Sequence, residues 1–174
     1  MTFIPRRYAM LAAYTVFLVM VDQLTKASIA RTMRLHESIP VIPGFFNLTY
    51  IRNPGAAFGL LASSSSGFRM VFFLLTSLFA IGLLMTIFFR LRPTDWWGQI
   101  TVATILGGAI GNLIDRIRYG EVIDFLDFYI DGYHWPAFNI ADTAISLGVC
   151  SLFILFACDK RKSHCAIPEH RSEL

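Results

Sequence analysis

Four stretches of apolar residues, separated by polar segments, set the pattern of the chain. A membrane-spanning helix needs about 20 mostly apolar residues, because the hydrocarbon core of a bilayer is about 30 Å thick. Residues 70–89 and 96–114 carry no charge over 20 and 19 positions, and residues 8–21 and 143–158 are uncharged over 14 and 16. The pattern predicts four transmembrane helices, at about residues 8–27, 68–89, 97–115 and 141–158.

Composition supports a membrane protein. Of the 174 residues, 55% are hydrophobic and 16% are charged, and the mean hydropathy is +0.57. A soluble domain carries about 25% charged residues, so this chain has too few polar side chains to cover a soluble surface. The net charge of +3, without a basic run interleaved with aromatic residues, gives no support for nucleic-acid binding. We expect one domain over residues 1–159 and a cytoplasmic tail over residues 160–174.

The first apolar run has a second interpretation. Arg6 and Arg7 followed by apolar residues are also typical of a secretory signal peptide, with residues 28–30 as a cleavage site. Asp22 and Lys26 would then lie just before the cut. Because they are four residues apart on one helix face, a role in a polar site explains them better, and we expect this helix to be part of the domain.

Basic residues are distributed unequally between the two sides of the predicted bundle. The termini and residues 90–95 together hold 8 Lys or Arg in 29 residues, whereas the two long loops and their flanks hold 7 in 73. Basic loops stay in the cytoplasm, so both termini are predicted to be cytoplasmic. The long loops, residues 28–67 and 116–140, are predicted to lie outside.

The outer loops contain strand-like segments. Residues 38–52 alternate short apolar runs with Pro and Gly, and residues 119–138 are rich in aromatic and β-forming residues. Together they predict a small β-sheet on the outer ends of the helices. Residues 56–61 are small and apolar, and we expect them to close over a bound peptide. Asp127 and Asp131 are interpreted as solvated loop acids.

Polar groups gather at one level of this topology. Intramembrane carboxylates are costly, so several of them at one depth indicate a shared site. The group consists of Asp22, Asn53, Asn112, Asp115, Arg116, Asp124, Asn139 and Asp142. Two members have a simpler interpretation, since Asp115 and Arg116 also suit an interfacial ion pair. Lys26 is expected to pair locally or to extend to the lipid headgroups.

Metal, cofactor and thiol chemistry are not predicted. His36 and His134 have no His or Cys at ligand spacing. Cys150, Cys158 and Cys165 do not face the oxidising side of this topology, so no disulfide is expected. The sequence contains no G-x-S-x-G motif, no HExxH motif and no phosphate loop.

Asp124 and Asp142 are the candidate catalytic pair. Asp124 lies in the apolar segment VIDF, and Asp142 ends the segment FNIAD at the predicted start of the last helix. Two acids held close in a dry pocket cannot both ionise easily, so one keeps a proton. One then serves as general base on water while the other polarises a carbonyl, which is peptide hydrolysis without a metal. We expect Asp142 to be the more readily ionised, because a helix N-terminus favours an anion.

Glycines punctuate the third predicted helix. Gly107 and Gly111 form a small-xxx-small face, and Gly108 lies beside them. Such faces let helices pack closely in a membrane. Close packing here also leaves room beside Asn112 for a ligand.

Five segments in order resemble one known family, the bacterial lipoprotein signal peptidases (signal peptidase II, aspartic peptidase family A8). The resemblance spans residues 8–158. The segments are DQLTK (22–26), NPGAAF (53–58), GGAIGNLIDR (107–116), VIDF (122–125) and FNIAD (138–142).

The resemblance implies an all-α membrane enzyme of the bacterial inner membrane with an outer β-sheet cradle. It implies that prolipoproteins are cut on the N-terminal side of a cysteine that carries diacylglycerol, with Asp124 and Asp142 as the catalytic pair. The implied partners are these substrates, membrane lipid and globomycin-type inhibitors; we expect a monomer and no cofactor. The implied substrate-binding residues are Asp22, Asn53, Gly108, Asn112, Arg116 and Asn139.

Two other functions stay open on the residues alone. A small transporter or proton-conducting subunit also uses intramembrane acids, but it would place them at several depths. A structural subunit that binds lipid headgroups would leave two acids in apolar segments unexplained.

Overall fold

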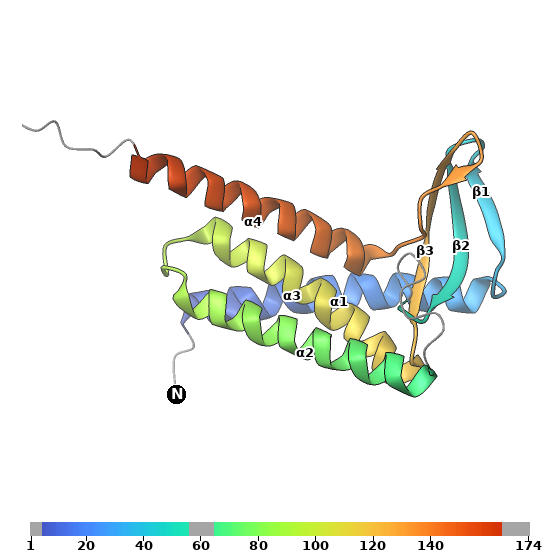
Figure 1. Cartoon of the computed structure of the whole chain (residues 1–174), viewed down its shortest axis with the longest axis horizontal. Helices are drawn as coiled ribbons and strands as arrows, with labels where there is room; N and C mark the ends of the chain where they lie inside the picture. Colours follow the sequence, from blue (N-terminus) through green and yellow to red (C-terminus); the bar gives the residue numbers. More distant parts are fainter. Residues whose placement is uncertain (1–4, 56–64, 165–174) are drawn as a thin grey trace, which may run out of the picture.

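Four helices lie alongside one another, and a small sheet stands across one end of the bundle (Figure 1). The computed structural model describes residues 5–55 and 65–164. The elements in chain order are α1 (Arg6–Thr32), β1 (Ser38–Ile42), β2 (Phe46–Asn53), α2 (Ser66–Arg90), α3 (Trp96–Tyr119), β3 (Val122–Ile130), β4 (Tyr133–His134) and α4 (Ile140–His164).

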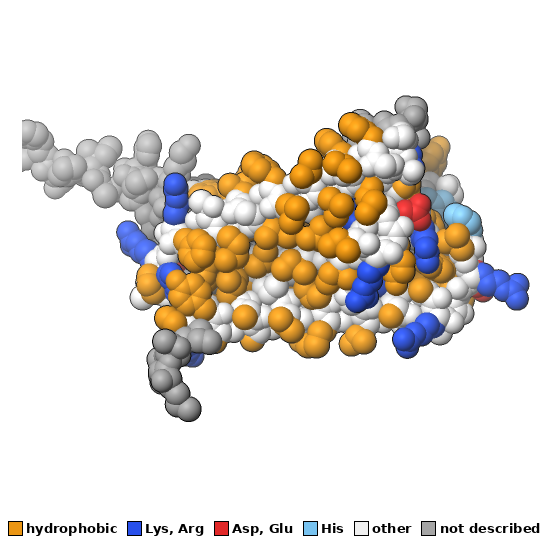
Figure 2. Space-filling view, turned by 90° about the horizontal axis from the view of Figure 1, so that it is seen from below, with side chains coloured by type: hydrophobic (Ala, Val, Ile, Leu, Met, Phe, Trp, Pro, Cys, Tyr) orange, Lys and Arg blue, Asp and Glu red, His pale blue; other side chains and the backbone are white. Residues whose placement is uncertain are grey.

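The surface of the bundle is that of a membrane protein. All four helices are long and apolar enough to cross a bilayer. Figure 2 shows an apolar band around the middle of the molecule, with Lys and Arg side chains gathered towards both ends. The predicted fold, four membrane helices with a small sheet, is therefore confirmed.

The helices extend beyond the apolar runs that predict them. α1 continues to Thr32, α3 to Tyr119 and α4 to His164. A helix ends where its backbone is capped rather than where its apolar residues stop. α3, for example, ends at Gly120, which adopts the left-handed conformation (φ 73°) and donates its N–H to the Arg116 carbonyl.

α3 is the central helix. Within its spanning window 56% of residues are buried, compared with 11–17% in the other three helices. Its glycines make this possible, as predicted: a Cβ on Gly107 would lie 2.8 Å from the Cβ of Leu18 in α1. A Cβ on Gly108 would collide with the carbonyl oxygen of Ala141 in α4. α3 is thus held between α1 and α4 by close backbone approach.

The sheet is antiparallel throughout, in the order β1-β2-β3-β4. Asp131 and Gly132 form a tight two-residue turn between β3 and β4, both with positive φ. The first four residues of β3 are all buried, whereas every residue of β1 is exposed. β3 is therefore the strand that carries side chains into the interior.

The acids of the outer loops differ in their exposure. The prediction that Asp127 is solvated is wrong, because β2 and β4 cover it: its carboxylate accepts a hydrogen bond from Asn47 Nδ2 (2.9 Å) and pairs with His134 Nδ1 (2.8 Å). Asp131 is exposed, as predicted. The predicted closing segment, residues 56–61, lies outside the described residues.

Candidate active site

The start of α4 is attached directly to β3, and this brings the two candidate catalytic acids together. The backbone of Phe138, just before α4, pairs with Leu126 of β3 through N–H to O distances of 2.8 and 3.1 Å. Asp124 lies two residues from this bridge on β3, and Asp142 lies in the first turn of α4. Asp124 therefore comes from a strand of the small sheet that residues 38–52 and 119–138 predicted.

Asn139 links the two acids. It precedes the first residue of α4, where its Oδ1 accepts the Asp142 N–H (2.9 Å) and its own N–H lies 3.3 Å from Asp142 Oδ2. This reciprocal pair is a capping box and satisfies two backbone donors of the helix N-terminus. The remaining group of the side chain, Nδ2, donates to Asp124 Oδ1 at 2.7 Å. Asn139 is fully buried, so it fixes both carboxylates in one place.

The second oxygen of Asp124 is held by β2. Asn53 Nδ2 donates to Asp124 Oδ2 at 2.9 Å. The strand register explains this contact: Ile51 lies opposite Asp124 and Asn53 opposite Val122, so the Asn53 and Asp124 side chains share one face of the sheet. Asn53 Oδ1 in turn accepts the Gly55 N–H (2.9 Å), which fixes the turn after β2.

Burial raises the pKa of Asp124 from its ordinary value of 3.8 to about 7, and the negative charge of Asp142 adds to this rise. Hydrogen bonds from Asn53 and Asn139 act in the opposite direction, since they favour the ionised form. Desolvation dominates because only 2% of Asp124 is exposed. Asp124 is thus a carboxyl group that holds a proton near neutral pH.

Asp142 has different surroundings. It is only partly buried, and it lies at the positive end of the α4 dipole. Its Oδ1 accepts a hydrogen bond of 2.7 Å from Asn112 Nδ2 of α3. A hydrogen-bonded carboxylate at a helix N-terminus is suited to carry a negative charge, so the two acids are equipped for opposite roles.

A fully buried ion cluster lies behind the pair. Lys26 Nζ lies 2.9 Å from Asp22 Oδ2, 3.0 Å from Asp115 Oδ2 and 2.9 Å from Asn112 Oδ1. Its three N–H donors therefore meet three acceptors. Of the two expectations for Lys26, local pairing is confirmed. Extension to the headgroups is wrong, because 1% of the residue is exposed.

The cluster also holds the elements that carry the catalytic pair. Asp22 Oδ1 accepts the N–H of Ala141 in the first turn of α4 (2.9 Å), and Asp115 Oδ2 accepts the N–H of Ile123 at the start of β3 (3.2 Å). Asp115 is 1% exposed. The simpler interpretation of Asp115 as an interfacial pair with Arg116 is therefore wrong.

Arg116 is the cation beside the pair. It is partly buried, and its guanidinium lies 5.3 Å from the ring centre of Phe73 in α2. It interacts electrostatically with Asp142, Asp115 and Asp124. Within residues 5–55 and 65–164, however, no carboxylate lies within 4.0 Å of it to form a salt bridge.

Hydrogen bonds and ion pairs to Lys26 connect seven of the eight predicted polar residues, and Arg116 lies beside this network and interacts with its acids electrostatically. Gly108 provides the close contact between α3 and α4 rather than a polar group.

Two residues that contact the site were not predicted from the sequence. Gln23 Nε2 donates to Asp115 Oδ1 (2.9 Å), and Phe73 contacts both Arg116 and Gly55. Gln23 lies inside the DQLTK segment, which was the available signal. Nothing in the sequence distinguishes Phe73 from the other apolar residues of α2.

Comparison with known proteins agrees with this geometry. The family model for signal peptidase (SPase) II matches residues 14–158. The lipoprotein signal peptidase of Syntrophus aciditrophicus is 58% identical over 135 residues, which are 78% of this chain and 84% of that protein. The lipoprotein signal peptidase of Syntrophotalea carbinolica is 49% identical over 148 residues, covering 85% and 91%.

Solved structures agree as well. A bacterial membrane enzyme solved by the in meso method at 2.3 Å resolution superposes with a TM-score of 0.79 at 35% identity, covering 95% of both chains. A second bacterial membrane enzyme, solved at 1.9 Å, gives a TM-score of 0.76 at 38% identity and covers 85% of this chain and 92% of that one. By sequence and by fold, the chain belongs to the signal peptidase II family.

Proposed function

We propose that Asp124 and Asp142 are the catalytic pair with which this chain removes signal peptides from prolipoproteins. The observation that carries the proposal is the bridging role of Asn139, which holds one acid through its side chain and the other through the helix cap. The two acids are thereby adjacent but unequal. Asp124 is buried and keeps its proton, while Asp142 is partly exposed and carries the charge.

The unequal pair supplies both halves of an acid–base hydrolysis. Asp142 takes a proton from a water molecule, whose oxygen attacks the carbonyl carbon of the peptide bond. Asp124 donates its proton to the carbonyl oxygen, which gives a neutral tetrahedral intermediate. When the intermediate collapses, the C–N bond breaks, Asp142 returns its proton to the leaving amine and Asp124 recovers its own from the hydroxyl group. The water is consumed and both acids regain their starting states.

Membership of the signal peptidase II family supports a specific substrate. We propose a prolipoprotein whose cysteine already carries diacylglycerol, cut on the N-terminal side of that cysteine. The acyl chains would stay in the bilayer beside the helices, and the peptide would reach the acids where β3 meets α4. Arg116 is placed to donate hydrogen bonds to the peptide backbone, and Asn112 and Asn53 to keep the acids in place.

The cellular setting follows from the charge distribution. The basic termini support a cytoplasmic location for both ends of the chain. With that orientation, the sheet and the acids would lie near the outer surface of the bacterial plasma membrane. We propose a monomer as the working unit. A globomycin-type cyclic peptide would compete with the substrate for the space beside the acids.

The experiment uses the purified full chain and a diacylglyceryl-modified prolipoprotein. Asp124→Asn and Asp142→Asn should each abolish cleavage, because an amide can neither give nor take the required proton. Asp131→Asn is the matched control, since it removes one charge from the exposed turn of the same sheet, and it should cleave normally. Cleavage that survives either active-site substitution in a folded variant would disprove the catalytic pair.

A second comparison tests the substrate. The same prolipoprotein without diacylglycerol should remain uncut by the unaltered chain. Equal cleavage of both forms would leave the peptidase intact but remove the lipid requirement.

A further inference from the structure

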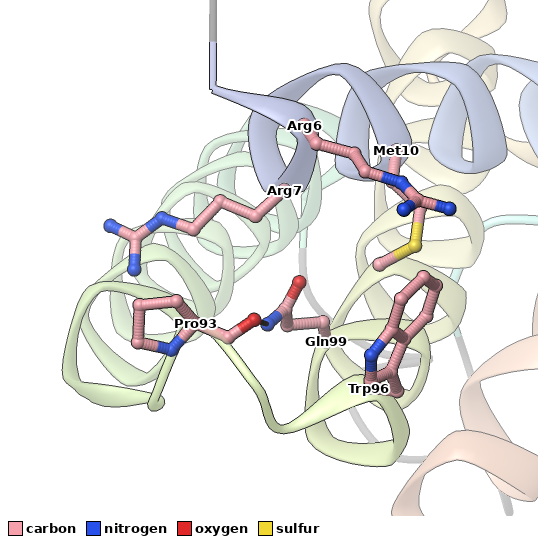
Figure 3. A pocket seen from close by; sticks show the side chains of 6 residues that line it. All are labelled: Arg6, Arg7, Met10, Pro93, Trp96 and Gln99. Atoms are coloured by element: carbon pink, nitrogen blue, oxygen red, sulfur yellow. Dashed lines mark hydrogen bonds between the residues drawn. The ribbon is translucent and has the colours of Figure 1, made fainter.

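A second polar site lies at the opposite end of the bundle from the sheet. It is a cavity of about 60 Å³ between the first turn of α1, the turn that joins α2 to α3, and the first turn of α3. No residue of the catalytic network contributes to it. Figure 3 shows the side chains that line it, which are Arg6, Arg7, Met10, Pro93, Trp96 and Gln99.

Two cations, Arg6 and Arg7, flank the cavity. No carboxylate in the described part of the chain lies within 4.0 Å of Arg6 or Arg7. Arg6 stacks on the Trp96 ring (5.0 Å), while Arg7 stacks on the Tyr8 ring (4.6 Å) and donates to its hydroxyl (2.5 Å). Stacking occupies the face of a guanidinium and leaves donors along its edge. The positive charge at the cavity is therefore available to a ligand.

Asp95, which precedes Trp96 in the chain, is engaged by the backbone of α3. Asp95 caps α3, where its Oδ1 accepts the Gly98 N–H at 2.9 Å, and its side chain is not part of the cavity lining. The first turn of α1 contains no acid, and no side chain caps it. A negative charge at this position therefore gains from the helix dipole as well as from the arginines.

Gln99 adds an acceptor, its Oε1, to the lining of the cavity. The residue is 3% exposed, and its Nε2 donates to the carbonyl oxygens of Arg92 and Pro93 (3.1 and 3.0 Å). Those bonds fix the amide, and Figure 3 shows the amide oxygen turned away from the turn and towards the space below Arg6 and Arg7. Among residues 5–55 and 65–164, no group donates to this oxygen. A ligand that fits here carries a hydrogen-bond donor as well as a negative charge.

The cavity lies at the end of a membrane-spanning helix, and this position indicates the class of ligand that could reach it. Trp96 and Trp97 are 49% and 73% exposed at the end of a membrane-spanning helix. Trp residues in such positions lie at the level of the lipid headgroups. Basic pockets between helices at this level bind anionic lipid headgroups.

We propose that this cavity binds the headgroup of an anionic phospholipid of the phosphatidylglycerol class. The phosphate accepts hydrogen bonds from Arg6 and Arg7, and a headgroup hydroxyl donates to Gln99 Oε1. The acyl chains leave along the apolar surface of Met10 and Trp96. The site is separate from the catalytic pair and would tether the bundle to anionic lipid from the opposite end.

The test measures lipid binding to the purified full chain in neutral detergent by native mass spectrometry. Phosphatidylglycerol should bind more tightly than phosphatidylcholine with the same acyl chains. Arg6→Gln with Arg7→Gln should weaken phosphatidylglycerol binding by about tenfold or more, because charge-assisted hydrogen bonds are lost. The matched control is Arg90→Gln with Arg92→Gln, which removes the same charge from exposed positions at the same end and should change binding less than about twofold.

Several results would overturn the proposal. Equal weakening in the two double variants would mean diffuse attraction of anionic lipid rather than a site. Equal binding of phosphatidylcholine would remove the need for negative charge. Displacement of the lipid by soluble glycerol phosphate at a similar concentration would identify a free-phosphate site instead. Because the two lipids are compared on the unaltered chain, the proposal remains falsifiable even if the Arg6 and Arg7 double variant fails to fold.

Discussion

At the scale of single residues, the site depends on two carboxylates that share a neighbour but not an environment. Asp124 is buried in a strand and receives two amide hydrogen bonds, whereas Asp142 is partly exposed at a helix N-terminus. Asn139 touches both. Burial therefore assigns the proton to Asp124, and this assignment has a measurable pH dependence.

Cleavage should fall as the pH rises through about 7, because Asp124 acts in its protonated form and its pKa is about 7. Asn53→Ala removes a hydrogen bond that favours the ionised form, so the pKa of Asp124 should rise further. The alkaline limb of kcat/KM against pH should then move to higher pH by roughly one to two units, since one such bond is worth about 1.5–3 kcal/mol and one pKa unit about 1.4 kcal/mol.

The same sheet offers a control for this prediction. Asn47 donates to Asp127 over the same distance, 2.9 Å, at which Asn53 donates to Asp124. Asn47→Ala therefore removes an equivalent bond away from the catalytic pair and should leave the position of the limb unchanged. A limb that stays fixed or moves to lower pH in Asn53→Ala would contradict the assignment of Asp124 as the proton donor.

Lys26 is the cation that pairs with the two buried carboxylates Asp22 and Asp115. Lys26→Met leaves Asp22 and Asp115 without their cation and removes a donor from Asn112. Loss of one partner from a buried ion pair costs about 3–5 kcal/mol, so the thermal unfolding temperature in detergent should fall sharply. Adding Asp115→Asn should restore part of the loss, because one uncompensated charge is then absent. Losses that simply add would show that the two residues do not interact.

Some residues of the site can be predicted from the sequence, and others cannot. Asp22 and Lys26 are recognisable because they lie four residues apart on one face of an apolar helix. Asp115 completes the cluster from α3, 89 positions further along the chain than Lys26, so no local pattern reveals the contact. Asp127 was misjudged for the same reason, because its burial comes from Asn47 of a different strand.

At the scale of elements, hydrophobic length predicts the helices but not their ends. Apolar residues report where lipid or protein covers a helix, whereas its ends are set by caps such as Gly120 after α3 and Asn139 before α4. The strands were expected from their turns and β-forming residues. The pairing of Phe138 with Leu126 was not, although it is the contact that brings α4 to Asp124.

Gly108 tests the contact between α3 and α4. In Gly108→Ala the new methyl group would meet the Ala141 carbonyl and the Ile145 side chain, so the two helices must separate. Overpacking of this kind costs about 1–3 kcal/mol. The unfolding temperature should fall, and cleavage should fall with it because Ala141 adjoins Asp142.

Gly82 provides the matched substitution in α2. Nothing lies within 4 Å of the Cβ that Gly82→Ala would add. Stability should therefore stay the same or rise by up to about 1 kcal/mol, because Ala forms helices better than Gly. Equal loss in both variants would mean that the loss in Gly108→Ala does not come from the contact between α3 and α4.

At the scale of the whole molecule, the polar network lies between two apolar clusters. One, around Phe88 and Val102, joins α1, α2 and α3, and the other, around Ile29, Tyr50 and Phe125, joins α1 to the sheet. The acids are thus enclosed towards the sheet end of the bundle, while the arginine-flanked cavity lies at the far end. The orientation of the bundle decides which of these two sites faces which side of the membrane.

Cysteine labelling of intact cells tests that orientation. In a chain whose native Cys150, Cys158 and Cys165 are replaced by Ala, Tyr133→Cys places a thiol on the sheet and Thr94→Cys places one on the turn between α2 and α3; both positions are exposed. A membrane-impermeant maleimide should label Tyr133→Cys in intact cells and Thr94→Cys only after the membrane is opened. The reverse pattern would put the acids on the cytoplasmic side. Basic residues would then fail to predict the topology, because the more basic end would lie outside.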